Sequence, residues 1–282
     1  MMGYHCISKR LLAVFTFITV CYVFPQKEIF AQDKVNKSNN KFIVFSTGFG
    51  TLTDFSKNKS DFESAEIGYP AFLSDYFALN LQTEFKTDRY EQIYQLNTFY
   101  SSAVKYYGGR LEDRNLDENA GSYFHLSFSY NLNRKLYESR RFIFYAGLIG
   151  KALIEDRRII YSSIGKMKTA DLYVLTGSAL KIEAPVFEKY FLRAGMNNYF
   201  ALPFLDFTIF KIPAYHKNYR QTLIESDFNI SLEYEIAENR FIGLSFTREE
   251  YRSLKISEAI SVPRKDSNRN TFMFSVKYPI GF

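Results

Sequence analysis

One pair of residues offers the functional groups of a hydrolase. His125 and Ser127 lie two positions apart in a stretch where polar and apolar residues alternate. Residues at positions i and i+2 share one face of a β-strand, so the imidazole and the hydroxyl would point the same way. A histidine base beside a serine nucleophile needs an orienting acid, and the sequence identifies none. A hydrogen-bonded His–Ser pair in the protein interior is therefore the simpler interpretation.

A set of charged residues is a second candidate for a functional cluster. We expect their side chains to line the inside of a narrow barrel: Glu66, Glu84, Lys181, Glu183, Arg193, Glu233, Glu235 and Arg248. In a low-dielectric interior these charges must pair, because a lone buried charge is costly. The sequence therefore predicts a salt-bridged plug of the lumen, and a narrow ion-selective pore is the alternative interpretation.

The sequence predicts neither a metal site nor a cofactor. Asp113, Asn115, Asp117 and Asn119 alternate faintly as in a calcium loop, but Glu118 stands where such a loop needs glycine. We find no zinc-ligand spacing and no glycine-rich phosphate loop. We therefore expect no cofactor and no enzymatic activity.

Alternation of apolar and polar residues indicates the elements that position these groups. It is clearest at the C-terminus, where one face would carry Phe272, Phe274, Val276, Tyr278, Ile280 and Phe282. A period of two residues is typical of a β-strand with one apolar face. The other predicted strands are 42–51, 65–73, 76–85, 123–132, 141–151, 172–186, 190–200, 228–236 and 240–249.

The connections between these strands alternate between short and long. Short connections are expected at 74–75, 133–140, 187–189 and 237–239. In a barrel of the bacterial outer membrane, short turns face the periplasm and long loops face the exterior. We therefore predict an all-β fold, an antiparallel up-and-down transmembrane β-barrel of about ten strands, with eight or twelve as alternatives. Residues 93–107 are expected outside the membrane, although a hairpin there would raise the count to twelve.

Aromatic residues support a membrane position. The chain has 29 Phe and 22 Tyr but no Trp, and a group of tyrosines lies near the predicted short turns or the C-terminus: Tyr76, Tyr130, Tyr190, Tyr234 and Tyr278. Such a girdle places each ring at the edge of the lipid and each hydroxyl in water. A soluble β-sandwich is the alternative, and it requires the apolar faces to bury each other.

The N-terminus reads as an export signal. Lys9 and Arg10 precede an apolar run of residues 11–24, which is shorter than the roughly 20 residues of a transmembrane helix. Ala31 offers a small residue for cleavage, and a signal ending in Ala-Gln resembles those of Bacteroidetes-type bacteria. We therefore divide the chain into a signal peptide at 1–31, a periplasmic tail at 32–40 and a barrel at 41–282. Both cysteines, Cys6 and Cys21, fall in the signal.

The last strand resembles the terminal strand of Gram-negative outer-membrane barrels, which ends in an aromatic residue. The resemblance implies that Val276, Tyr278, Ile280 and Phe282 carry recognition by the barrel assembly machinery. The His-x-Ser pair is similar to that of outer-membrane phospholipases and lipid A deacylases. Barrel proteases of the omptin kind use Asp and His at the outer rim, and the sequence has no Asp-x-His pair.

These features lead to one preferred function and one alternative. We predict an outer-membrane barrel of structural, adhesive or narrow-channel type, with a lumen filled by charged side chains. The alternative is a lipid hydrolase that uses His125 and Ser127. The net charge of +6 favours contact with the phosphates of lipopolysaccharide by Coulomb attraction. Outer-membrane lipid is the other expected partner, and nucleic acid is not expected for an exported chain. The sequence does not predict the oligomeric state.

Overall fold

A computed structural model describes most of the chain after residue 39. The described ranges are 40–55, 71–102, 104–107, 110–111, 114–115, 120–161, 165–201, 207–212, 215–219, 222–254 and 266–280. Within them no helix is long and apolar enough to cross a membrane. The predicted signal peptide at 1–31, most of the predicted tail at 32–40, Glu66 and Phe282 lie outside these ranges.

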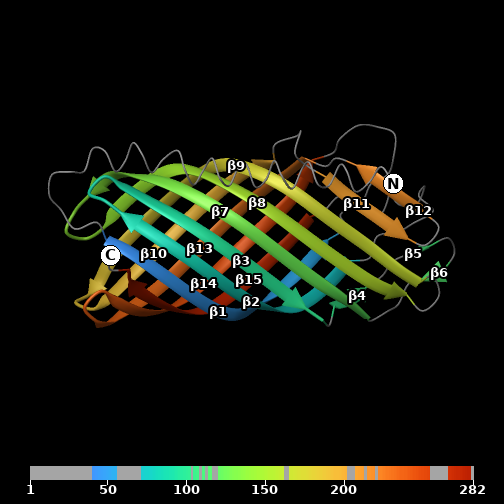
Figure 1. Ribbon diagram of the computed structural model, residues 1–282, viewed down its shortest axis with the longest axis horizontal. Helices are drawn as coiled ribbons and strands as arrows, with labels where there is room; N and C mark the ends of the chain where they lie inside the picture. The colour runs from blue at the N-terminus through green and yellow to red at the C-terminus, as the bar shows by residue number, and fades with distance from the viewer. Residues whose placement is uncertain are drawn as a thin grey trace.

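Ten long antiparallel strands close into a barrel within the described ranges (Figure 1). They are β1 (Asn40–Phe55), β2 (Ala71–Lys86), β3 (Tyr90–Ser101), β7 (Ala120–Glu138), β8 (Ile143–Tyr161), β9 (Gly165–Phe187), β10 (Tyr190–Ala201), β13 (Thr222–Ala237), β14 (Arg240–Leu254) and β15 (Asp266–Pro279). Each strand pairs with the next in this order, and β1 pairs with β15 to complete the ring. The predicted fold class and strand number are therefore confirmed.

Short strands extend the barrel at the end where the long loops lie. They are β4 (Val104–Tyr107), β5 (Arg110–Leu111), β6 (Arg114–Asn115), β11 (Phe207–Ile212) and β12 (Tyr215–Tyr219). Strand β4 pairs with β2, while β11 pairs with β9 and with β12. Figure 1 shows β11 and β12 beyond one end of the barrel, opposite the short turns. Because β9 has 23 residues, it reaches well past the roughly 9–11 residues that cross a bilayer.

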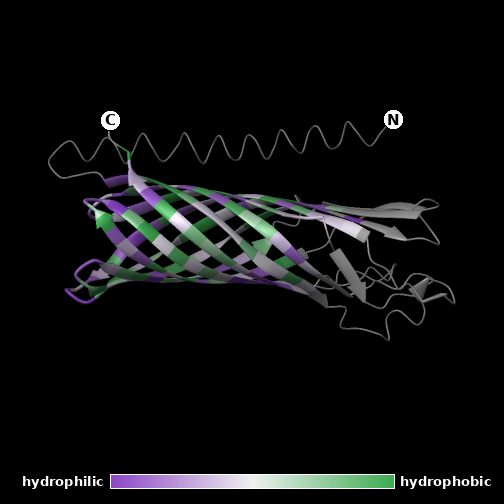
Figure 2. Cartoon of the chain, turned by 90° about the horizontal axis from the view of Figure 1, so that it is seen from below, coloured by the Kyte–Doolittle hydropathy of each residue, from purple (hydrophilic) through white to green (hydrophobic). Residues whose placement is uncertain are grey.

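An apolar belt surrounds the barrel wall. Along each strand, alternate side chains point outward, and they include Phe49 at 70% exposed, Leu148 at 70% and Leu244 at 65%. Figure 2 shows hydrophobic positions alternating with hydrophilic ones along the wall, and hydrophilic turns at one end. A closed barrel satisfies every backbone group in its wall, which is what the lipid interior demands. The apolar faces therefore face outward and do not bury each other, which excludes the β-sandwich.

Local hydrogen bonds explain the short turns at the periplasmic end. The backbone N–H of Thr87 donates to the carbonyl of Tyr90 at 2.8 Å, and its hydroxyl accepts from the Tyr90 N–H at 3.0 Å. In the turn between β13 and β14, Asn239 has a φ of 57° and donates its N–H to the Glu235 carboxylate at 2.9 Å. Asparagine tolerates this left-handed conformation better than most residues.

Two predicted elements are wrong in detail, although the strand number is right. Residues 74–75 are not a turn, because β2 runs without a break and pairs Asp75 with Thr51 of β1. Strand β3, which covers much of the segment expected outside the membrane, is part of the wall between β2 and β7. Ser74 and Asp75 lie beyond the outermost belt residue of β2, Phe77. Both faces are polar there, so alternation no longer separates strand from turn.

The tyrosine girdle forms at four of its five predicted positions on the barrel exterior. Tyr190 and Tyr234 pair across β10 and β13 with ring centroids 4.8 Å apart, and Tyr278 is 44% exposed on β15. Tyr130 also faces outward, against Tyr94. The fifth, Tyr76, is wrong: it is buried in the lumen at the long-loop end.

Candidate functional site

The lumen near the periplasmic turns is crossed by a layer of paired charges, which we call the inner layer. It consists of four carboxylates and four cations: Glu84, Glu91, Glu183, Glu233, Lys86, Lys181, Arg193 and Lys277. These residues come from β2, β3, β9, β10, β13 and β15, so the layer spans the barrel from side to side. Successive side chains of a strand point to opposite faces, and these residues all occupy positions that point into the barrel.

Every charge of the inner layer has a partner of opposite sign. Arg193 lies 3.1 Å from Glu84, 3.1 Å from Glu183 and 2.9 Å from Glu233. Lys181 lies 2.7 Å from Glu91 and 2.9 Å from Glu183. Because the charges balance, the layer meets the requirement that buried ions be paired and hydrogen-bonded. It joins opposite walls and stiffens the lumen.

A cluster of phenylalanines completes the inner layer. Phe241 packs edge-on against Phe42 and Phe191, with ring centroids 6.3 Å and 5.7 Å away. The ammonium group of Lys277 lies 4.4 Å from the centre of the Phe42 ring and also pairs with Glu84. A cation over an aromatic face is attracted by the ring quadrupole. Ionic and aromatic contacts thus fill the lumen near the periplasmic turns.

A polar cavity of about 190 Å³ lies in the middle of the lumen. We call it the chamber. Its wall carries many uncharged amides and hydroxyls, among them Asn80, Gln95, Asn97, Ser129, Asn131, Asn197, Asn229, Ser245 and Thr247. The charged side chains of Glu84, Arg193 and Glu233 border it at one end and those of Asp227 and Glu249 at the other. The chamber therefore separates two charged layers.

The second charged layer, the outer layer, is built around Arg269. This side chain is fully buried, and its guanidinium donates to Glu249, to the Tyr251 hydroxyl and, at 2.9 Å, to the Tyr123 hydroxyl. It also stacks 4.5 Å from the centre of the Phe99 ring. A guanidinium offers five donors in a fixed plane, so it can bind several acceptors at once. One arginine thus ties β15 to β3, β7 and β14.

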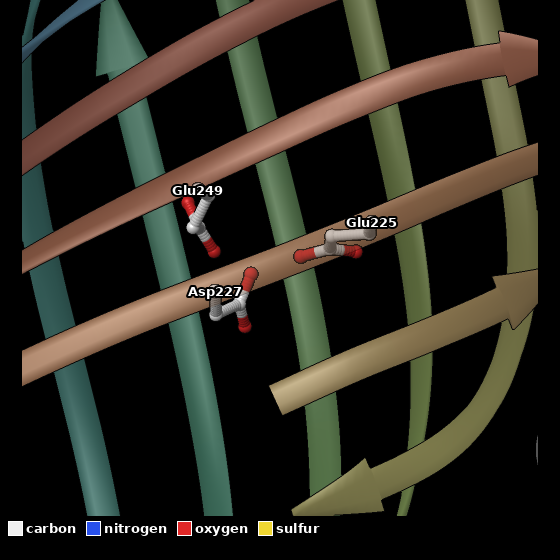
Figure 3. Close-up of side chains that lie close together, drawn as sticks. All are labelled: Glu225, Asp227 and Glu249. Carbon is white, nitrogen blue, oxygen red and sulfur yellow. The ribbon is translucent and has the colours of Figure 1, made fainter. Parts of the chain in front are cut away.

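Three carboxylates of the outer layer lie close together. Glu225, Asp227 and Glu249 are buried, and their oxygens lie within 4.8 Å of one another (Figure 3). The ammonium group of Lys151 pairs with Glu225 and lies 3.3 Å from Glu249. Carboxylates at this spacing could bind a hard cation such as calcium. In the structure Lys151 supplies the positive charge to two of them.

The outer layer has more acids than bases among the described side chains. Its buried carboxylates are Glu155, Asp171, Glu225, Asp227 and Glu249, and its buried cations are Lys151 and Arg269. The inner layer, by contrast, has equal numbers.

Apolar and tyrosine side chains fill the lumen beside the outer layer. This cluster consists of Ile149, Leu153, Tyr173, Leu175, Ala179, Tyr199, Ala201, Leu223 and Tyr251. Tyr173, Leu175 and Leu223 are fully buried. Apolar side chains packed this closely exclude water. Packed side chains and ion pairs thus fill part of the lumen on the long-loop side of the chamber.

The His-x-Ser pair lies in this packed region. His125 is fully buried, stacks on Phe99 at 4.9 Å and has Nδ1 3.2 Å from the Glu155 carboxylate. A Glu–His contact is the orienting half of a hydrolase triad. However, an Arg269 nitrogen lies 3.0 Å from the same Nδ1. Arginine can only donate, so Nδ1 must accept from it and cannot at the same time donate to Glu155.

Five of the eight charged residues predicted from the sequence come together, two lie elsewhere, and one is outside the described residues. Glu84, Lys181, Glu183, Arg193 and Glu233 meet in the inner layer. Glu66 lies outside the described residues.

Two of the predicted lumenal charges lie away from the inner layer. Glu235 accepts a bond in the turn at Asn239 instead of joining that layer. The prediction for Arg248 is wrong: its side chain is 50% exposed on the outer surface and pairs with Glu250. Around this position both faces of β14 carry charges, so alternation does not predict whether a side chain points inward or outward.

The sequence reasoning missed most of the cations that complete the two layers. Lys277 stands on the polar face of the last strand, so the alternation there could have identified it. Glu225 and Asp227 stand four and two positions before Asn229, on the same face of β13. Arg269 had no such signal, because it precedes the apolar stripe that begins at Phe272.

The last strand carries the residues expected to act in assembly. Val276 and Tyr278 point outward from β15, and the Ile280 N–H donates to the carbonyl of Lys41 at 2.8 Å. Strand β15 pairs on both sides, with β14 and with β1. Strand β15 therefore closes the ring between β14 and β1. Recognition by the assembly machinery stays a prediction.

The comparisons with known proteins give a fold but no family. No family model matches the chain, and no curated protein matches it. Among solved structures, the outer membrane protease OmpT of Escherichia coli is similar at 9% identity, over 88% of this chain and 99% of that one, with a TM-score of 0.61. The translocator domain of the autotransporter NalP of Neisseria meningitidis is similar at 8% identity, over 93% and 97%, with a TM-score of 0.48.

Fold and belt together define the class of this protein. The likeness to OmpT shows a shared barrel architecture and, at this identity, nothing about activity. A closed antiparallel barrel with an outward apolar belt is the form that spans the Gram-negative outer membrane. The chain is therefore an outer-membrane β-barrel protein, surrounded by the lipid of that membrane.

Proposed function

We propose that this protein is a non-enzymatic outer-membrane barrel of structural or adhesive type, with a lumen that is closed at rest. One observation carries the proposal: charged layers cross the lumen on both sides of the chamber, and each is packed with aromatic side chains. Open aqueous barrels have about sixteen strands, whereas barrels near eight are filled by side chains. Ten strands with these two layers belong to the filled kind.

The extension of the strands beyond the membrane supports a surface role. Strands β7 and β8 have 19 residues each, and β9 has 23. About half of each strand is enough to cross the hydrocarbon core. The rest, joined by β11 and β12, forms a sheet on the side of the long loops. A closed barrel is a rigid base for displaying such a sheet outside the cell.

A planar lipid bilayer tests the closed lumen. We refold the chain in detergent, verify folding by its heat-modifiable mobility on a gel, and record current across the bilayer. The proposal predicts no steady single-channel conductance, because both layers block the path. A stable conductance that grows with voltage from the folded protein would contradict it and favour an open narrow channel.

The same preparation separates this proposal from the hydrolase alternative. The Glu155–His125 contact is the observation that favours a lipid hydrolase. We expect no release of fatty acid from phospholipid vesicles. Release that His125→Ala and Ser127→Ala both abolish, while the variants keep the folded mobility, would replace the proposal with the hydrolase.

A further inference from the structure

The short turns at the periplasmic end of the described chain are joined in pairs. In the first pair, the backbone N–H of Lys135 beside the β7–β8 turn donates to the carbonyl of Arg89 in the β2–β3 turn at 2.8 Å. In the second pair, the N–H of Glu235 beside the β13–β14 turn donates to the carbonyl of Lys189 in the β9–β10 turn at 2.9 Å. The strand order runs from β2 to β8 and then from β9 to β14, so each pair covers its own part of the ring.

The two pairs of turns differ in charge. The first, which we call the basic turn pair, consists of residues 87–89 and 134–141, and its charged residues are Arg89, Arg134, Lys135, Arg140, Arg141, Asp88 and Glu138. The second, the acidic turn pair, consists of residues 187–189 and 235–240, and its charged residues are Lys189, Arg240, Glu188, Glu235 and Glu238. The formal charges of the two sets are therefore +3 and −1.

The arginines of the basic turn pair are free to bind an anion. Arg89, Arg134, Arg140 and Arg141 are exposed, and none of them forms an ion pair with an acid of the described chain. Lys135, by contrast, pairs with Glu138 at 2.7 Å. A guanidinium matches the oxygens of a phosphate group with two parallel hydrogen bonds. Several unpaired guanidinium groups on neighbouring turns thus favour a ligand that carries phosphate.

Exposed apolar side chains lie among these arginines. A β-bulge between Lys135 and Tyr137 leaves Leu136 and Tyr137 both exposed, at 56% and 54%. The Tyr137 ring packs against that of Phe142, with the ring centroids 5.3 Å apart. Aromatic rings beside long basic side chains are typical of the depth at which a membrane protein meets the lipid headgroups. The arginines therefore stand at the level of headgroup phosphates.

The acidic turn pair has aromatic contacts of the same kind. The ring of Tyr190 lies 6.1 Å from that of Phe187 and 4.8 Å from that of Tyr234, and Phe187 is exposed. These rings place the acidic turn pair at a similar depth in the membrane. The chief difference between the two parts of the rim is thus their charge.

We propose that the basic turn pair is a binding surface for anionic phospholipids of the periplasmic leaflet, of the phosphatidylglycerol type. The headgroup phosphate accepts hydrogen bonds from the arginines, while Leu136, Tyr137 and Phe142 pack against the upper part of the acyl chains. The acidic turn pair lacks the charge for this, so anionic lipid gathers along one part of the ring. The inference goes beyond the proposed function and does not depend on whether the lumen conducts.

A single tryptophan beside each pair of turns measures the local preference for lipid. The chain has no Trp, and Leu136 and Val186 are exposed apolar residues next to the basic and the acidic turn pair. The full chain with Leu136→Trp or Val186→Trp is placed in nanodiscs of phosphatidylcholine. Increasing fractions of phosphatidylglycerol or phosphatidylcholine with brominated acyl chains are then added. The quenching curves give the affinity for the anionic lipid relative to the neutral one at each position.

The proposal predicts a preference at one position only. At Leu136→Trp, phosphatidylglycerol binds about fivefold more tightly than phosphatidylcholine, the factor that one basic side chain contributes near an anionic surface. At Val186→Trp the two lipids bind equally. High salt weakens the preference, because exposed charges are screened. Equal binding of the two lipids at Leu136→Trp, or the same preference at both positions, would overturn the proposal.

Substitution of the arginines links the preference to the basic turn pair. In the Leu136→Trp protein, Arg140→Gln with Arg141→Gln lowers the preference, and adding Arg89→Gln and Arg134→Gln abolishes it. The matched control is Lys189→Gln with Arg240→Gln, which also removes two exposed cations from periplasmic turns and leaves the preference unchanged. All variants are compared by heat-modifiable mobility. A preference that survives the loss of all four arginines, or that falls equally in the control, contradicts the assignment.

Bound lipid gives a second readout that needs no tryptophan. The parent protein and the variant without the four arginines are incubated in mild detergent with equal amounts of the two lipids, and the lipids that stay bound are identified by mass spectrometry. The parent is expected to retain mainly phosphatidylglycerol, and the variant equal amounts of both. A parent protein that retains both lipids equally would refute the proposal, even if Leu136→Trp failed to fold.

Discussion

At the residue scale, the protein depends on a few buried ions that have partners on distant strands. Arg269 illustrates this, because its guanidinium joins an acid and a tyrosine of β14 to a tyrosine of β7. The inward face of a strand was predictable by counting alternate residues, which identified Glu84 and Arg193. The partner of each ion was not predictable, since it depends on barrel closure and register. Alternation also failed where both faces are polar, as at Arg248.

Replacement of Arg269 tests how much its buried contacts stabilise the barrel. We expect Arg269→Ala to lower the free energy of unfolding by about 3–5 kcal/mol, because it leaves buried carboxylates without their cation. The measurement is urea unfolding of the barrel in lipid vesicles. Arg248→Ala is the matched control: its side chain is 50% exposed and pairs with Glu250, so a loss of only about 0–1 kcal/mol is expected. Equal losses for both variants would contradict a buried structural role for Arg269.

At the element scale, the barrel is defined by which strands belong to its wall. The C-terminal strand, β9, β10, β13 and the turns beside them were predictable, because a continuous apolar stripe ends at a turn rich in charged residues. Strand β3 was not predictable as part of the wall, because apolar and polar residues do not separate clearly between its two faces. Its inward face carries Glu91, Ile93 and Gln95. The predicted strand boundaries divided β2 into two strands at 74–75 and left β3 out of the wall. These two errors cancel, so the predicted number of ten strands was still right.

A lysine on the outward face of β3 tests its place in the wall. Leu96 is 40% exposed in the belt, whereas Tyr137 is 54% exposed near a periplasmic turn. A lysine at mid-membrane costs about 2–4 kcal/mol and at the interface about 0–1 kcal/mol. We therefore expect Leu96→Lys to destabilise the barrel much more than Tyr137→Lys, as measured by urea unfolding in vesicles. If Leu96→Lys were harmless, β3 would lie outside the lipid.

At the scale of the whole molecule, the account depends on one division of surfaces: apolar side chains outside and polar side chains within. The hydrophobic stripes predict this division, and the exposed apolar side chains of the ten strands confirm it. The sequence could not establish that the ten stripes join into one belt, nor that the lumen holds two charged layers with a chamber between them. Both properties arise from closure, which brings together residues more than a hundred positions apart.

Lipid quenching of a single tryptophan tests this division most directly. The chain has no Trp, so each variant gives one fluorescence signal, and Leu244 and Ser245 are neighbours on β14 with opposite orientation. In vesicles of lipids brominated on their acyl chains, the account predicts strong quenching for Leu244→Trp and weak quenching for Ser245→Trp. Equal quenching, or stronger quenching at position 245, would contradict the membrane barrel described above.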